Sequence, residues 1–557
     1  MEKKGMEERT EKKLPKLPIG IQTFKIIRTE GYLYVDKTKY LVDLVDNGRI
    51  YFLSRPRRFG KSLTISTFDA LFSGEKELFQ GLYAENFMNR PDYKTYPVVR
   101  LDMSNLTTHM GPDAFRVSIL ERIQENARRL DVSVESPTPG DAFYRLLINA
   151  AEKYKTPVVL LIDEYDSPIL RHLFDLPRIT EIRGILKDFY MRVKAADEVL
   201  RFVFMTGISK FSKMGVFSAL NSLDDISADT AFAAMLGYTE EELALDFAGF
   251  LDAISSQRNE SKRELLTQIK NYYDGFSFDG ETRLYNPFSA LNFFRKKAFL
   301  NFWFESGTPS FLVDYIKRHD VEVEAFRGYE VSRSFTSITE IEQASPENFL
   351  FQSGYLTVRA CKGDNFILDY PNEEVLSSVA RLFLYGKLDV KGFDAEANNL
   401  SRALTDGDAA VLARMYDKLL MTIPYDIYEK EEKKYADNKT GERNRVYPLA
   451  ESFFHALLFS MLWASCARTT AENHSYKGRS DIEAEKNGHR YVIELKVAEG
   501  KEAAEKAARA ALRQIHEKGY ADRYAGEDVT LLGLGVDRQA RRVAKAEIEH
   551  LGGTVKA

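Results

Sequence analysis

A continuous apolar run at residues 157–166, PVVLLIDEYD, constrains the fold of this chain more than any other stretch. A strand with one face in solvent alternates apolar and polar residues, but this run stays apolar at successive positions, which indicates a parallel strand buried on both faces. The run ends in Asp163 and Glu164. Two carboxylates at this point either face a site at the C-terminal edge of the sheet or mark a strand that exits into solvent.

Further strand-like and helix-like segments alternate around this run. This alternation is typical of a parallel sheet with helices on both faces. The sequence therefore predicts an α/β fold for the N-terminal part of the chain. The predicted strands are 50–53, 96–104, 157–164 and 200–209, and the predicted helices are 115–130, 142–154 and 179–195.

The second informative stretch is 50–64, IYFLSRPRRFGKSLT, where a short apolar strand leads through a basic turn into a helix. Gly60, Lys61 and Ser62 match the end of the phosphate-binding pattern G-x-x-x-x-G-K-[ST]. In that pattern the glycine lets the backbone approach a phosphate, the lysine reaches the β/γ oxygens and the hydroxyl holds Mg²⁺. Arg55 stands at the position of the first glycine. A basic surface loop is therefore the alternative interpretation.

The two stretches together, in this order, favour a nucleotide-binding core of the P-loop NTPase kind. In such a core the first acid after the buried strand, Asp163, holds Mg²⁺ through water, and the second, Glu164, orients the attacking water. Thr206 and Ser209 end the next predicted strand. Either hydroxyl could contact the γ-phosphate, although a strand end in solvent explains them equally well.

Composition limits the remaining function classes. A chain of 557 residues is too long for one hydrophobic core, and its net charge of −5 does not fit a polycationic nucleic-acid coat. Two cysteines, Cys361 and Cys466, argue against a disulfide framework or a thiolate metal site and fit a reducing cytoplasm. No apolar run reaches the ~18 residues that a membrane-spanning helix needs, so we expect a cytoplasmic protein with no membrane partner.

Changes in sequence character suggest five segments. A charged tail (1–17) precedes the P-loop core (18–228), and a helical and mixed middle region (229–427) follows it. Residues 428–445 are almost wholly charged or polar, which is typical of an exposed linker. The last segment, 446–557, is predicted to form a second α/β domain.

In this last segment, two short predicted strands carry three charged residues in a pattern that suits a metal. Asp481 lies on the first strand, and Glu494 and Lys496 lie two residues apart on the second, so these two share one face. Two carboxylates and a main-chain carbonyl make a hard oxygen site for Mg²⁺, and a lysine can position or deprotonate a water that attacks a phosphodiester. An exposed hairpin held by salt bridges is the alternative.

Two predicted helices flank these strands. An apolar helix with Glu451 near its start comes before them, and an alanine-rich helix that carries Gln514 and leads into Tyr520 comes after them. A further strand is predicted at 529–536. The order helix, strand, strand, helix, strand is that of a compact α/β nuclease core.

These motifs carry resemblances to two families. VDKT (35–38) and RPRRFGKS (55–62), together with VLLIDEYD, are similar to the AAA-ATPase-like family, in which a missing first glycine is usual. The C-terminal part resembles the PD-(D/E)xK nuclease superfamily, which has a restriction-endonuclease-like core, in the version fused to that ATPase. Ser480 stands here in place of the proline that names the motif. The two resemblances cover roughly two thirds of the chain, with the middle region between them.

The resemblances imply roles for individual residues. The implied ATP-binding residues are Arg57, Arg58, Gly60, Lys61, Ser62, Asp163 and Thr206. The implied catalytic residues are Glu164 in the first site and Glu451, Asp481, Glu494, Lys496 and Gln514 in the second. The implied Mg²⁺ ligands are Ser62 and Asp163 in the first site and Asp481 and Glu494 in the second.

We therefore expect an ATP-binding protein, an ATPase, coupled to a Mg²⁺-dependent nuclease domain. ATP and Mg²⁺ are the expected cofactors, with Mn²⁺ as another metal for the nuclease site, and nucleic acid is the expected partner. DNA and RNA are both open as substrates, and a homo-oligomer is compatible with the sequence. One alternative is a nucleotide-regulated switch or scaffold whose nuclease-like domain binds a partner without cleavage. Another is a C-terminal core that acts on something other than nucleic acid, because no basic recognition helix stands out.

Overall fold

The computed structural model of the chain divides into two compact units. One is formed by Met1–Phe302 with Phe326–Pro371, and the other by Trp303–Ala325 with Asn372–Ala557. Most of the predicted charged tail, and all of the predicted linker except its first residue, lie outside the described residues. The described residues are 14–210, 223–305, 326–333, 335, 344–386, 393–424, 427–428, 451–465, 467–475 and 478–552.

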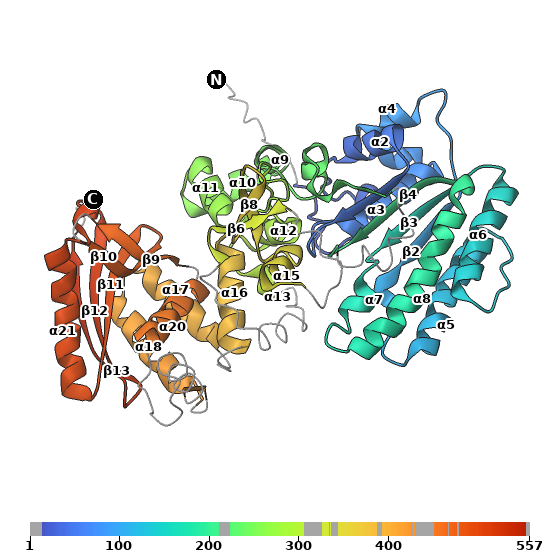
Figure 1. Ribbon diagram of the computed structural model, residues 1–557. Helices are drawn as coiled ribbons and strands as arrows, with labels where there is room; N and C mark the ends of the chain where they lie inside the picture. The colour runs from blue at the N-terminus through green and yellow to red at the C-terminus, as the bar shows by residue number, and fades with distance from the viewer. Residues whose placement is uncertain are drawn as a thin grey trace, which may run out of the picture. The chain divides into compact units, whose positions relative to one another are not determined.

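The first unit contains the parallel sheet that the sequence predicts, with helices around it (Figure 1). All strand pairs in this sheet are parallel. The third strand in the chain is buried at every residue, which is why its sequence does not alternate. In their order across the sheet, the five strands are β2 (Val98–Asp102), β3 (Val158–Asp163), β4 (Leu200–Gly207), β1 (Ile50–Ser54) and β5 (Asp224–Asp225).

Helices cover this sheet because each has an apolar stripe that must be buried. The helix that follows β1 packs on the central strands, and the three long helices that follow β2 and β3 pack side by side. These four helices are α3 (Lys61–Ser73), α5 (Pro112–Arg129), α6 (Pro139–Tyr154) and α8 (Leu176–Ala195).

Strand β2 lies at the edge of the sheet, and a side chain of α5 takes the place of a neighbouring strand there. The main-chain N–H of Arg100 donates to Oδ1 of Asn126 at 3.0 Å, and Nδ2 of Asn126 donates to the carbonyl of Arg100 at 2.9 Å. One carboxamide therefore satisfies both main-chain groups of an edge residue, as a paired strand would.

The rest of the first unit is helical with a small antiparallel sheet. The sheet has the strand order β6-β8-β7. The helices are α9 (Glu240–Asp246), α10 (Ala248–Arg258), α11 (Lys262–Tyr273), α12 (Pro287–Lys296) and α15 (Pro346–Gln352). The strands are β6 (Tyr329–Ser332), β7 (Thr357–Lys362) and β8 (Asn365–Asp369).

The second unit contains a mixed five-stranded sheet. Its central pair, β11 and β12, is parallel, and the other pairs are antiparallel. In order across the sheet, the strands are β13 (Arg542–Leu551), β12 (Asp528–Asp537), β11 (His489–Ala498), β10 (Gly478–Lys486) and β9 (Arg468–Ser475). The helices include α16 (Glu373–Gly386), α17 (Phe393–Thr405), α18 (Ala409–Thr422), α20 (Glu451–Ala464) and α21 (Lys501–Lys518).

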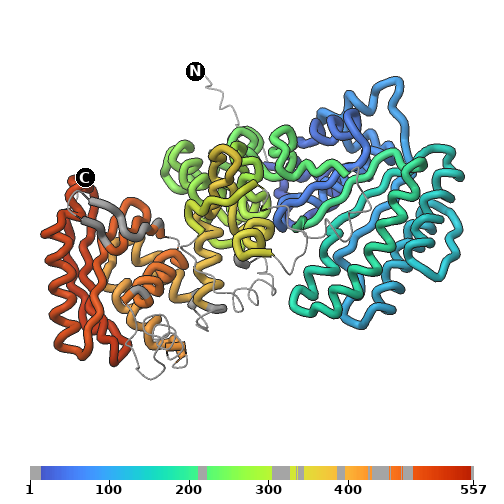
Figure 2. Tube along the Cα trace, in the orientation of Figure 1, coloured from blue at the N-terminus to red at the C-terminus, as the bar shows by residue number. Residues whose placement is uncertain are grey.

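Helix α21 lies along this sheet, as the red end of the tube in Figure 2 shows. Two glycines of β12 make this approach feasible. A Cβ atom on Gly535 would lie 2.0 Å from the carbonyl oxygen of Ala504, and one on Gly533 would lie 2.5 Å from that of Ala508. Any side chain at either glycine would therefore push the helix away from the strand.

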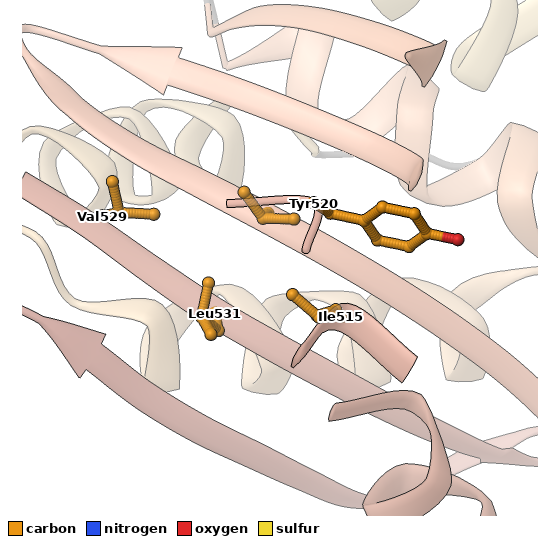
Figure 3. Packing of buried hydrophobic residues seen from close by; sticks show 5 residues of the cluster. Ile515, Tyr520, Val529 and Leu531 are labelled. Carbon is orange, nitrogen blue, oxygen red and sulfur yellow. The ribbon is translucent and has the colours of Figure 1, made fainter. Parts of the chain in front are cut away.

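The C-terminal end of α21 is held by an apolar cluster. Ile515 and Tyr520 pack against Val529 and Leu531 of β12, with Val492 of β11 in the same cluster (Figure 3). All five side chains are at most 2 % exposed. Their burial fixes the position of the helix turn that carries Gln514.

Among the described residues, no helix combines the length and the apolar character needed to cross a membrane.

Candidate functional site

The loop between β1 and α3 has the backbone that a phosphate-binding turn requires. Gly60 precedes the first residue of α3 with a φ of 100°, in a region that side chains with a Cβ rarely adopt. Arg58 also has a positive φ, 67°. The free N–H groups at the start of α3 therefore lie directly after a tight turn, as anion binding at a helix N-terminus requires.

Lys61 is buried beneath this loop. Its Nζ donates to the main-chain oxygens of Arg55 at 2.9 Å and of Pro56 at 3.0 Å. Burial lowers the pKa of the Lys61 ammonium, while the charges of Glu164 and Asp163 oppose that shift. The lysine therefore lies close to both acids that end β3.

Of the two acids at the end of β3, Asp163 is buried and Glu164 is half-buried. Asp163 is 2 % exposed and accepts a hydrogen bond from the hydroxyl of Ser62. Glu164 follows with a φ of 48°, which is unusual for a residue with a side chain. Burial raises the pKa of both carboxyl groups. Lys61, Ser62, Asp163 and Glu164 thus come together, as the sequence pattern requires of a P-loop site.

The hydroxyl residues at the end of β4 differ from one another. Thr206 is fully buried, and within the described residues its Oγ1 has no hydrogen-bond partner. Ser209, by contrast, donates through its Oγ to Asp166 at 2.6 Å, and its main-chain N–H donates to the same carboxylate at 2.7 Å. Of the two candidates for a phosphate contact, only Thr206 therefore keeps an unused hydroxyl.

Asp166 and Tyr165 join the ends of β3 and β4. The hydroxyl of Tyr165 donates to the main-chain oxygen of Ser209 at 2.6 Å, and its N–H donates to that of Thr206 at 3.1 Å. Burial raises the pKa of Asp166, although the bonds from Ser209 oppose the shift. Both residues were missed in the sequence, although they follow Asp163 and Glu164 directly.

The two arginines that the resemblance implicates in phosphate binding lie on the exposed side of the loop. Both Arg57 and Arg58 are exposed, and the guanidinium of Arg58 lies 4.6 Å from the ring centre of Phe288. Arg55, the residue in place of the first glycine, is only 1 % exposed. The basic loop therefore has one arginine in the core and two at the surface.

A polar cavity of about 350 Å³ lies beside this site, between β2 and α5. Its wall includes Asp102, which is opposite Asp163 in the register of β2 and β3, but no residue of the loop 55–60. The lining residues are Arg100, Asp102, Asn105, Arg122, Glu125, Asn126 and Arg129. This cavity is therefore adjacent to the acids of β3 rather than part of the phosphate loop.

In the second unit, the predicted site residues meet at the β10–β11 pair. Ile482 is opposite Ile493, so Asp481 and Glu494 are close to one another across the pair. The N–H of Leu495 donates to Oδ2 of Asp481 at 3.0 Å, and the N–H of Asp481 donates to Oε2 of Glu494 at 3.4 Å. The exposed hairpin considered above is excluded, because Glu494 is 1 % exposed.

Two helices complete this site. The amide of Gln514, on α21, donates to Oε1 of Glu494. Glu451, the first residue of α20, accepts a hydrogen bond from the N–H of Val497 at 3.3 Å. Lys496 is half-buried, and its positive charge opposes the burial that raises the pKa of Asp481 and of Glu494.

The carboxyl groups of this site destabilise each other's charged forms. Burial raises the pKa of Asp481, and it raises the pKa of Glu494 to about 7, with the charge of Asp481 adding to the shift at Glu494. Glu494 is buried and Asp481 is half-buried, and two carboxylates held this close favour either a proton or a cation between them.

His455 belongs to the site but was missed in the sequence. Its Nε2 lies 3.6 Å from Oδ2 of Asp481 and 3.8 Å from Oε1 of Glu451. Burial works to lower the pKa of His455, but the hydrogen bond to Glu451 and the charges of both carboxylates outweigh it, so the pKa is raised. The available signal was its spacing, because residues four apart on a helix share one face.

The donor set fits a hard divalent cation. Within the described part of the chain, no three histidine, cysteine or carboxylate side chains gather to hold a metal ion by themselves. Asp481 and Glu494 would supply two oxygen ligands, and a main-chain carbonyl would be needed as the third, as the sequence pattern predicted. Burial, with the charge of Asp481, raises the pKa of Glu494, and a bound cation would offset both effects.

The fold and the two sites define a P-loop NTPase domain joined in one chain to a nuclease-like α/β domain. Residues 18–217 match the AAA-ATPase-like family, described as Predicted AAA-ATPase, and residues 449–547 match the PD-(D/E)XK nuclease superfamily. The chain is 34 % identical over 546 residues to the "Uncharacterized protein in vnfD 5'region" of Azotobacter chroococcum mcd 1, covering 96 % of this chain and 99 % of that protein. The chain therefore belongs to the AAA-ATPase-like family and carries a PD-(D/E)XK nuclease superfamily domain.

Proposed function

We propose that the first site binds and hydrolyses ATP with Mg²⁺. The placement of Lys61 and Ser62 beside Asp163 and Glu164 supports this proposal. Bound Mg²⁺ would neutralise charge on the phosphate oxygens. Lys61 would bind β/γ oxygens, Ser62 and Asp163 would hold the metal, and Glu164 would orient the attacking water.

Three further residues have a part in this proposal. The unused hydroxyl of Thr206 would donate to the γ-phosphate. Arg57 and Arg58, at the exposed side of the loop, would approach the outer phosphate oxygens. All three contacts strengthen as negative charge gathers on the transferred phosphoryl group.

We also propose that the second site is a Mg²⁺-dependent nuclease that cleaves phosphodiester bonds in nucleic acid, with Mn²⁺ as an alternative metal. The single observation that carries this proposal is the close pairing of the half-buried Asp481 with the buried Glu494 across β10 and β11, and the raised pKa values of both suit a site for a cation. The metal would stabilise charge that develops on the phosphate. Lys496 would position or deprotonate the attacking water. Gln514 would hold Glu494 in place, and Glu451 would support the site through the N–H of Val497 and through His455.

A cleavage panel tests both proposals. The full chain is incubated with single- and double-stranded DNA and RNA, in Mg²⁺ or Mn²⁺, with and without ATP. Asp481→Ala should abolish cleavage and leave ATP binding intact, whereas Lys61→Ala should abolish ATP binding. A matched control is Asp528→Ala, which removes a carboxylate that pairs with His489 outside the site.

The results of this panel distinguish a nuclease from a switch or scaffold that does not cleave. Cleavage lost in Asp481→Ala and kept in Asp528→Ala would establish the nuclease, and its response to ATP and to Lys61→Ala would report coupling. If the wild-type chain binds ATP but cleaves nothing in the panel, the nuclease proposal fails. The protein would then be a nucleotide-regulated switch or scaffold.

A further inference from the structure

The phosphate-binding loop 55–60 packs against residues 274–288, which we call the brace. Phe59 of the loop lies edge-on to two aromatic rings of the brace, with centroid distances of 5.0 Å to Phe276 and 5.6 Å to Phe278. All three rings are buried. The contact is therefore a closed apolar interface within the first unit, and movement of one side must displace the other.

Two more residues of the loop touch the brace. The side-chain amide of Asn286 donates to the main-chain oxygen of Arg57 at 3.5 Å, while its Oδ1 caps the start of α12. The ring of Phe288 lies beneath the guanidinium of Arg58, at 4.6 Å. The brace therefore contacts the main chain of the loop as well as its side chains.

Arg55 makes the deepest of these contacts. Its guanidinium carbon lies 4.1 Å from the ring centre of Phe278, and Nη1 donates to the main-chain oxygens of Ser54 at 3.0 Å and Ser227 at 2.6 Å. Burial lowers the pKa of Arg55 to about 9. Within the described residues, its Nε and Nη2 have no hydrogen-bond partner. A fully buried arginine thus replaces the glycine that would leave this space empty.

The brace is hydrogen-bonded in turn to the strand β7, and its Gly275 lies close to Pro371 at the end of the unit. The N–H of Ser277 donates to Oγ1 of Thr357 at 2.6 Å, and the N–H of Val358 donates to the oxygen of Ser277 at 3.2 Å. A Cβ on Gly275 would lie 2.1 Å from the oxygen of Pro371. Pro371 is the last residue of the first unit, and the chain passes from it into the unit that carries the nuclease-like site.

Lys61 links the nucleotide-binding position to the main chain of the loop. Two protons of its ammonium are now used on the main-chain oxygens of Arg55 and Pro56. Phosphate oxygens would compete for the same protons, so binding of a nucleotide would change what holds the main chain at residues 55 and 56. The side chain of Arg55 is attached at that point, and the brace is packed on it.

We propose that the conformation of the brace depends on whether a nucleotide occupies the loop 55–60. Arg55 is the positioning residue through which this change reaches β7 and Pro371. The inference rests on the proposed binding of ATP and adds a route by which ATP could act on the second unit. It assigns no contact with nucleotide to Arg55 or to Phe278.

Hydrogen exchange of the full chain, read by mass spectrometry, tests the proposal. Saturating Mg²⁺-ATP should slow exchange of main-chain amides at 276–284 and 357–361 by about tenfold or more, because both segments lie on the path. ATP binding is measured separately by calorimetry. If ATP binds and exchange in both segments stays unchanged, the inference is overturned and the proposed ATP site stands. If ATP does not bind, both are overturned.

Two variants test whether the contact between Arg55 and Phe278 is needed for this exchange response. Phe278→Leu keeps an apolar side chain but removes the ring face, and it should retain ATP binding while the exchange response at 357–361 is lost. Phe143→Leu is the matched control, because Phe143 stacks on Phe189 at 4.4 Å without touching the loop, and its response should equal that of wild type. If Phe278→Leu does not fold, Arg55→Lys serves instead, because lysine keeps the charge without the stacking plane. A normal response in the folded variant overturns the role of the Arg55 contact.

Discussion

The amide of Gln514 donates to the carboxylate of Glu494 from a different element of the second unit. Helix α21 carries the donor and strand β11 carries the acceptor, and the two are held together where the glycines of β12 let the helix approach. The side chain of the central acid in the site is therefore fixed by the packing of a helix that the sequence places 20 residues away.

The stability of the metal-free second unit should fall as pH rises. The pKa of Glu494 is raised from 4.5 to about 7, so its contribution is fully present below pH 4.5 and is lost as the pH rises through about 7. Asp481 acts in the same direction. Glu494→Gln should flatten most of this dependence. Denaturation followed by tryptophan fluorescence is selective for this unit, because both tryptophans, Trp303 and Trp463, belong to it. Equal slopes in both proteins would refute the prediction.

Divalent metal should stabilise the same unit through Asp481. At a Mg²⁺ or Mn²⁺ concentration 100 times Kd, we expect about 2.7 kcal/mol of added stability in wild type and little in Asp481→Asn. The matched control is Glu485→Gln, on the same strand, where the carboxylate pairs with Arg490. Tryptophan-monitored denaturation with and without EDTA measures the effect. Stabilisation of Asp481→Asn equal to that of wild type would place the metal elsewhere.

The hydroxyl of Thr206 should matter for ATP hydrolysis and not for stability. Because its Oγ1 has no partner among the described residues, Thr206→Val loses no hydrogen bond and should change stability by less than about 0.5 kcal/mol. Hydrolysis should fall about tenfold or more, with ATP binding kept. Thr67→Val should lower stability and leave ATP hydrolysis unchanged, because the buried hydroxyl of Thr67 donates to the main-chain oxygen of Leu63 at 2.8 Å. Calorimetry and a phosphate-release assay distinguish the two, and unchanged hydrolysis in Thr206→Val would rule out the contact.

Gly535→Ala should destabilise the second unit by more than about 2 kcal/mol, because the new methyl group would collide with the main chain of α21 at Ala504. The displaced helix should also weaken metal binding, since it carries Gln514. Gly184→Ala in α8 is the contrasting control, because its new Cβ would meet nothing within 4 Å and alanine favours a helix. Thermal unfolding measures both, and a neutral Gly535→Ala would show that the helix shifts freely.

Local sequence patterns were sufficient to predict the parallel sheet. The buried run at β3 and the helical periodicities around it depend on neighbours in the chain, and the fold class that they predict is confirmed. The mixed sheet of the second unit was only partly predicted, because β9 and β13 were missed. Both are edge strands, whose polar residues give a weak apolar signal.

The site residues were also predicted only in part. Lys61 with Asp163, and Asp481 with Glu494, were predicted because strand ends and strand pairs bring them together. His455 was missed although it lies four residues after Glu451, because its contact with Asp481 on another element leaves no local pattern. The burial of Arg55 was missed for a related reason: a basic residue in a turn suggests solvent, and only the distant Phe278 makes a buried position favourable.

The paired amide of Asn126 also has a consequence for association between molecules. The edge of a sheet offers unpaired main-chain groups to which a strand of another chain can add, which is a route to aggregation. At β2 the main-chain groups of Arg100 are already bonded to Asn126. An incoming strand would have to displace that carboxamide before it could pair in the middle of β2. Any assembly of this protein is therefore disfavoured from growing by strand addition at this edge.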